Sequence, residues 1–185
     1  MQIFNEQIDK AISFAVKAHK DQFRKTDSSL PYIYHPVSVG FILIRAGFSD
    51  DVVIAGILHD VIEDCGITSE ELKSVFGEKI TELVQSVSEN KNDSWEKRKQ
   101  DYSDRIMKFS PEVKAIAAAD KLHNIYSLIN TIKTGGDIDK LFKKDKMTTV
   151  DYYTNFTESL IKNWFHPIVD ELRLASEQLR KEARI

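Results

Sequence analysis

One short run, His59-Asp60-x-x-Glu63-Asp64, places an imidazole and three carboxylates within about two turns of a predicted helix. It directly follows an apolar stretch over residues 52–58, and charges held beside buried surface destabilise a protein unless something compensates them. A bound cation compensates a histidine beside an aspartate, and further carboxylates next to that cation are candidates for acid–base work. The run therefore predicts a cation site with acid–base groups beside it.

Two distant segments carry residue types that suit the same cation. His35 stands at the entrance of a predicted helix, and Asp120 shares the apolar face of a later one. Together with His59 and Asp60 they form a mixed set of nitrogen and oxygen donors. Such a set suits six-coordinate Mn²⁺, Mg²⁺ or Fe²⁺ better than a closed tetrahedral zinc site.

Helices must position these residues. Apolar side chains recur at steps of three and four residues, and Gly and Pro are rare, with counts of 7 and 4. No segment shows the alternation of a strand. The sequence predicts an all-α globular bundle. The expected helices run over about 5–23, from near Pro36 to Gly47, over about 50–64, from Thr68 to before Gly77, over about 78–89, from Ser94, from Ser110, over about 146–165 and from Pro167 to the end.

Bulk properties narrow the class of protein. A chain of 185 residues without a linker predicts a single domain over 1–185. The net charge of −3 argues against a dedicated nucleic-acid binder. One cysteine, Cys65, excludes an internal disulfide, and no apolar run approaches the roughly 18 residues of a membrane span. We expect a cytoplasmic protein that does not associate with membranes. The sequence does not decide its oligomeric state, and a homodimer is one of the alternatives.

Four segments then identify a family. They are Ala18-His19-Lys20-Asp21-Gln22-Phe23-Arg24-Lys25, Leu30-Pro31-Tyr32-Ile33-Tyr34-His35-Pro36-Val37, Gly56-Ile57-Leu58-His59-Asp60-Val61-Ile62-Glu63-Asp64 and Ala118-Ala119-Asp120-Lys121-Leu122-His123-Asn124. In this order they resemble the HD metal-dependent phosphohydrolase superfamily, and within it the RelA/SpoT-type hydrolase domain and its stand-alone small alarmone hydrolases. The resemblance implies an HD-domain helical bundle with a motif core over about 15–130 and C-terminal helices over about 146–185.

The resemblance also implies a role for each matching residue. The implied metal ligands are His35, His59, Asp60 and Asp120. Mn²⁺ is the usual ion of this branch, and Mg²⁺ and Fe²⁺ are the alternatives. The residues implied to position or activate the attacking water are Glu63 and Asp64. The implied contacts to a nucleotide substrate are Arg24, Lys25, Asn124 and, as a weaker match, Tyr152.

The implied reaction is hydrolytic removal of the 3′-pyrophosphate from guanosine tetra- or pentaphosphate. Two alternatives stay open: an HD phosphohydrolase that acts on NADPH or another nucleotide, and a non-catalytic metal-containing nucleotide sensor. Residues 26–30 depart from the compact glycine-bearing turn of the branch, so the loop that faces the substrate is expected to differ. His123 is expected to be structural. The run Lys97-Arg98-Lys99 is expected to be a solvated helix face, with contact to a phosphate group as the less favoured alternative.

Overall fold

A computed structural model describes residues 4–89, 93–142 and 144–185 of the chain. Over these residues the architecture is helical and contains no strand; an isolated antiparallel bridge joins Phe23 to Pro31. The predicted all-α class is confirmed. Within the same residues, no helix is both long and apolar enough to cross a membrane.

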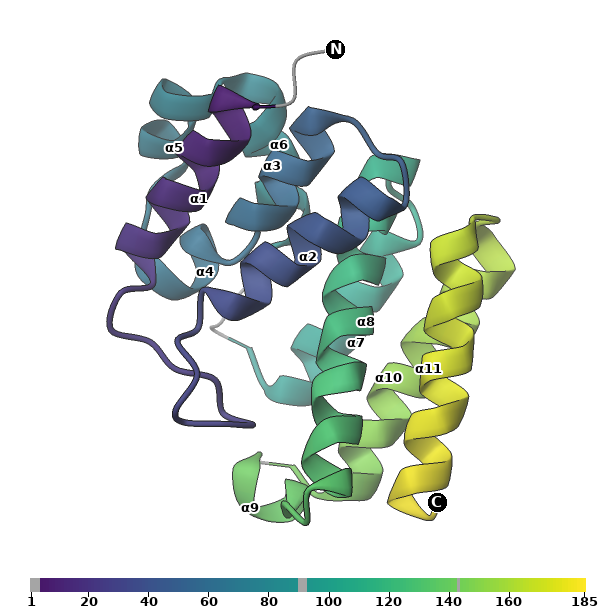
Figure 1. Ribbon diagram of the computed structural model, residues 1–185. Coiled ribbons are helices and arrows are strands. Elements are labelled where there is room, and N and C mark those ends of the chain that lie inside the picture. The colour runs from purple at the N-terminus through teal and green to yellow at the C-terminus, as the bar shows by residue number, and fades with distance from the viewer. Residues whose placement is uncertain (1–3, 90–92, 143) are drawn as a thin grey trace.

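The helices form two groups around one long central helix (Figure 1). On one side of α8 lie α2 and α3, and on its other side lies α11, which also packs against α10. In chain order the helices are α1 (Glu6–Ala18), α2 (Tyr34–Arg45), α3 (Asp50–Leu58), α4 (Val61–Cys65), α5 (Ser69–Phe76), α6 (Glu78–Val87), α7 (Trp95–Ile106), α8 (Pro111–Lys133), α9 (Ile138–Leu141), α10 (Lys146–Asn163) and α11 (Pro167–Ala183).

Two helices dominate the core because they are buried nearly all round. Every residue of α3 from Val52 to Leu58 is buried, as are four alanines of α8, at position 115 and over 117–119. Small side chains on α8 let α2, α3 and α11 approach it closely. The polar residues at the end of α3 and in the middle of α8 are therefore held by the two helices that are most completely buried.

The first helix is shorter than predicted. It ends at Ala18, not near residue 23, and His19 leaves the helical conformation. Backbone hydrogen bonds then close residues 22–32 into a loop: Tyr32 N donates to Gln22 O and Arg24 N donates to Leu30 O. These bonds compete with continuation of the helix, and they carry Arg24 away from the helix axis.

The predicted helix over residues 50–64 is also wrong, because it divides into α3 and α4. The break falls on His59 and Asp60, and Asp60 has φ −99° and ψ −6°. The short helix α4 ends at Gly66, whose φ of 71° is a left-handed conformation that glycine adopts without steric cost. The interruption places the His-Asp pair at a corner, where both side chains turn toward α8.

Gly56 lies where α3 crosses α2, and we expect Gly56→Ala to destabilise the fold. A Cβ atom at this position would lie 2.3 Å from Cδ1 of Leu43, which is fully buried. Overpacking a core costs about 1–3 kcal/mol, and at so short a contact the cost should lie in the upper part of this range, so it outweighs the roughly 1 kcal/mol gained by alanine in a helix. Urea denaturation should show a net loss of about 1–2 kcal/mol. The exposed substitution Glu158→Ala is the control, and an equal stability for both variants would contradict this packing.

Candidate functional site

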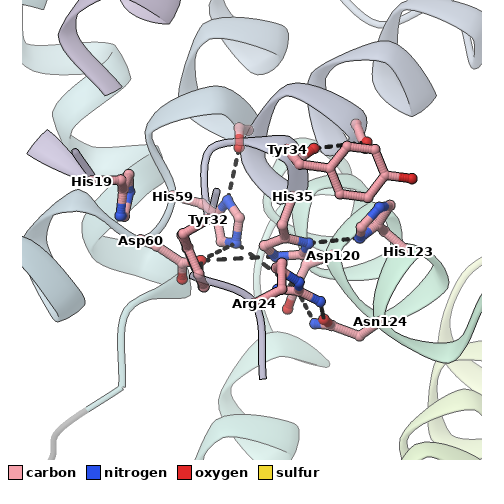
Figure 2. Close-up of polar contacts among 12 residues, drawn as sticks. His19, Arg24, Tyr32, Tyr34, His35, His59, Asp60, Asp120, His123 and Asn124 are labelled. Atoms are coloured by element: carbon pink, nitrogen blue, oxygen red, sulfur yellow. Dashed lines mark hydrogen bonds and ion pairs between the residues drawn. The ribbon is translucent and has the colours of Figure 1, made fainter. Parts of the chain in front are cut away.

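Three buried side chains from three helical segments converge beside α8. His35 comes from the first turn of α2, His59 from the end of α3 and Asp120 from the middle of α8. Their donor atoms lie within 4.8 Å of one another. His35 Nε2 is 3.1 Å from Asp120 Oδ1, and His59 Nε2 is 3.8 Å from the same oxygen (Figure 2). Segments 24 and 61 residues apart thus meet at one point.

Asp60 adds a fourth donor to this cluster. Its Oδ2 lies 3.0 Å from His59 Nε2 and 3.8 Å from His35 Nε2. His59 Nδ1 is 2.8 Å from the carbonyl oxygen of Gly56, so Nδ1 holds the ring proton that this carbonyl accepts. The opposite atom, His59 Nε2, is buried and faces the carboxylate of Asp60, but it forms no hydrogen bond of good geometry with any described residue. A buried imidazole nitrogen without a well-formed hydrogen bond, surrounded by carboxylate oxygens, is suited to bind a cation in place of a proton.

The charges in the cluster depend strongly on one another. Burial favours the neutral imidazole of His59, but the charge of Asp60 outweighs burial and raises the pKa of His59 to about 9. Burial lowers the pKa of His35. Burial would raise the pKa of Asp120, yet the nearby Lys121 ammonium keeps it well below its usual range. Burial would raise the pKa of Asp60 as well, but the charge of His59 lowers it. Both carboxylates therefore stay ionised in a buried site, and the donor set fits a divalent cation.

Glu63 and Asp64 follow the cluster on α4, and both line a cavity that the four cluster residues also line. Oε2 of Glu63 accepts a hydrogen bond of 3.0 Å from the backbone N–H of Glu89. Burial raises the pKa of Glu63. On the other side of the turn, the carbonyl oxygen of Asp64 accepts a hydrogen bond of 2.9 Å from Nε2 of Gln22. These contacts fix α4 between the 22–32 loop and the end of α6.

The profile of the HD domain family matches residues 11–137, which include the four cluster residues. The chain belongs to the HD domain family.

Curated relatives of this HD domain chain cover most of it. The guanosine-3′,5′-bis(diphosphate) 3′-pyrophosphohydrolase MESH1 of Mus musculus is 37% identical over 131 residues, 70% of this chain and 73% of that protein. The MESH1 protein of Homo sapiens is 37% identical over 124 residues, 66% of this chain and 69% of that protein. A guanosine-3′,5′-bis(diphosphate) 3′-pyrophosphohydrolase of Aquifex aeolicus is 35% identical, but the match spans only 18% of it.

Solved structures have the same fold. The structure of a metazoan SpoT ortholog superposes with a TM-score of 0.81 over 98% of this chain and 97% of the other, at 24% identity. A Listeria monocytogenes EGD-e protein gives a TM-score of 0.74 at 32% identity, covering 80% of this chain and 99% of that protein. The predicted membership of the HD domain family is confirmed.

The cluster of His35, His59, Asp60 and Asp120, here called the HD cluster, lines a cavity of about 720 Å³, a volume ordinary for a small-molecule site. The residues predicted to contact substrate, namely Arg24, Lys25, Asn124 and Tyr152, all line it. Nη2 of Arg24 donates to Oδ1 of Asn124 at 2.9 Å, while the Nδ2 group of Asn124 donates to Oδ1 of Asp120 at 2.6 Å. Figure 2 shows this chain of contacts from the loop to the cluster.

Sequence reasoning missed several residues of this HD domain cavity. Arg98 and Lys99, from the run predicted to be a solvated face, line it, and Lys99 Nζ pairs with Glu89 Oε1 at 2.5 Å. Tyr32 Oη donates to Asp60 Oδ2 at 2.6 Å, and Lys121 Nζ is 2.6 Å from Asp120 Oδ2. Tyr32 and Lys121 lie within the recognised motifs, and this position in the sequence could have identified them as residues of the site. The run Lys97-Arg98-Lys99 contained no such signal, because helical periodicity alone did not show which of its side chains face the protein interior.

Proposed function

We propose that this HD domain protein is a metal-dependent hydrolase that removes the 3′-pyrophosphate from guanosine tetra- or pentaphosphate. One observation carries the proposal: the cluster of His35, His59, Asp60 and Asp120 opens into a cavity that Arg24, Lys25, Arg98 and Lys99 also line. A cation site facing basic side chains suits a substrate with several phosphate groups. Relatives that carry this activity in their names align with about two thirds of the chain or more.

The cation of this proposal is Mn²⁺, with Mg²⁺ or Fe²⁺ as alternatives. His35, His59, Asp60 and Asp120 would hold it through two imidazole nitrogens and two carboxylates. Imidazole favours transition metals over Mg²⁺, and the carboxylates suit Mn²⁺. When bound, the cation would supply Lewis acidity and lower the pKa of water.

The remaining roles follow from position. Glu63 and Asp64 orient the attacking water and accept its proton, because they line the cavity one turn beyond the His-Asp pair. Arg24 and Lys25 offset the phosphate charge, and Asn124 links Arg24 to the cluster. Tyr152 packs against the nucleoside: it faces the cavity, and its ring centroid lies 5.8 Å from that of Trp95.

The proposal takes residues 1–185 as a single catalytic domain. The central helix α8 packs against α2 and α3 on one side and α11 on the other, so the C-terminal helices share a core with the motif region. Tyr152 of α10 lines the same cavity as the His59-Asp60 pair and residues of α4.

The test is hydrolysis by the purified protein with Mn²⁺. Guanosine tetraphosphate and water should give guanosine diphosphate and pyrophosphate in equal amounts, and chelation by EDTA should stop the reaction. NADPH is the parallel substrate, with release of inorganic phosphate as its readout. Turnover of NADPH alone would transfer the proposal to that nucleotide, and absence of turnover with Mn²⁺, Mg²⁺ and Fe²⁺ on both substrates would reject it.

A further inference from the structure

His123 meets His35 through like atoms. Nδ1 of His123, on α8, lies 2.8 Å from Nδ1 of His35, on α2, and both side chains are buried, 8% and 1% exposed (Figure 2). The ring of Tyr34 packs edge-on against His123 with centroids 5.2 Å apart. A hydrogen bond between two Nδ1 atoms needs a proton on one ring and a lone pair on the other.

The opposite nitrogen of His35 faces the HD cluster, 3.1 Å from Asp120 Oδ1. To bind a cation, Nε2 of His35 must present a lone pair, so the single proton of the neutral ring must be on Nδ1. That proton points at His123, whose Nδ1 must then be the acceptor and whose own proton must be on Nε2. The state of His123 thus decides which nitrogen His35 offers to the cluster.

The opposite arrangement is favoured when no cation is bound. A lone pair on Nε2 of His35 would then face the ionised Asp120, and the two would repel each other. A proton on Nε2 removes the repulsion and leaves Nδ1 of His35 bare, so it accepts from Nδ1–H of His123. The donor and acceptor of the His35–His123 hydrogen bond therefore exchange when a cation enters.

We propose that His123 is a positioning residue that presents Nε2 of His35 to the cation by reversing its role in this hydrogen bond; the inference rests on the proposed cation site. The protons balance. One proton crosses from Nδ1 of His123 to Nδ1 of His35, His35 releases its Nε2 proton to solvent, and His123 takes one from solvent at Nε2. The two neutral rings carry two protons before and after.

A matched pair of variants separates the hydrogen bond from packing. In His123→Asn an amide oxygen can replace Nδ1 as acceptor, whereas His123→Leu has a similar shape and no polar atom. By calorimetric titration with Mn²⁺, we expect His123→Leu to bind about 10–100-fold more weakly than wild type, and His123→Asn to recover most of this loss. The control is His166→Gln, at the N-cap of α11 and outside the cluster, and this variant should bind Mn²⁺ as wild type does.

A measurement on the wild-type protein does not depend on the variants' folding. Long-range ¹H–¹⁵N correlation spectra distinguish Nδ1–H from Nε2–H tautomers of each histidine. Without a cation we expect the His123 proton on Nδ1, and with saturating diamagnetic Mg²⁺ on Nε2. A His123 proton on the same nitrogen in both spectra, or His123→Leu within threefold of wild type, would overturn the inference while hydrolysis continues. A wild-type protein that binds no cation would overturn the proposed metal site itself.

Discussion

Replacing Asp60 with asparagine is expected to lower the affinity for Mn²⁺ by more than about 100-fold, because loss of a direct ligand costs more than the 10–100-fold of an outer-shell change. The turnover of guanosine tetraphosphate at a fixed, subsaturating Mn²⁺ concentration should fall by the same factor. Asp60 is the sharper choice over Asp120, whose second oxygen neutralises the buried Lys121. An asparagine oxygen at position 60 can still accept the hydrogen bond of Tyr32, so the variant removes charge with little change in shape.

The measurements are a calorimetric Mn²⁺ titration and a pyrophosphate-release assay over a range of Mn²⁺ concentrations. Asp170→Asn, at an exposed position of α11, is the matched control and should leave both unchanged. Circular dichroism in EDTA compares the folds without metal. If Asp60→Asn keeps wild-type affinity, Asp60 is a neighbour of the cluster and not one of its ligands.

The helical class and most helix starts could be predicted because they depend on local signals. Thr68 and Glu71 form a capping box at the start of α5, and Gly66 ends α4 in a left-handed conformation. The end of α1 and the break at His59 could not be predicted from helical periodicity. Both depend on contacts between distant segments: the bond from Tyr32 N to Gln22 O in one case, and the packing of α3 against α2 and α8 in the other.

The cluster residues could be proposed because their types are rare in apolar segments and their motifs occur in a fixed order. His123 belongs to the same motif, yet its partner is 88 positions away and depends on how α2 crosses α8. Arg98 and Lys99 could not be assigned to the cavity from the sequence, because a basic run on a polar helix is usually solvated. Which side of α7 faces the cavity is decided by Tyr102 and Ile106, the two buried residues of that helix.

Glu63→Gln is expected to lower kcat by about 10²–10⁴-fold, the range that a positioned general base contributes. The physical reason is the loss of proton acceptance with little change in shape. A glutamine oxygen can still accept the hydrogen bond from Glu89 N–H, so the position of α4 should be kept. The affinity for Mn²⁺ should change only a few-fold, because none of the four cluster donors is altered.

This combination of effects separates Glu63 from the cluster residues. Asp60→Asn should be rescued in part by raising Mn²⁺, whereas Glu63→Gln should stay slow at every Mn²⁺ concentration, since its defect is in proton transfer. Glu82→Gln, an exposed glutamate on α6, is the matched control for the loss of one carboxylate charge. Steady-state kinetics on guanosine tetraphosphate give kcat and KM for each variant. A kcat within threefold of wild type for Glu63→Gln would transfer the role of base to Asp64, which the same assay on Asp64→Asn then tests.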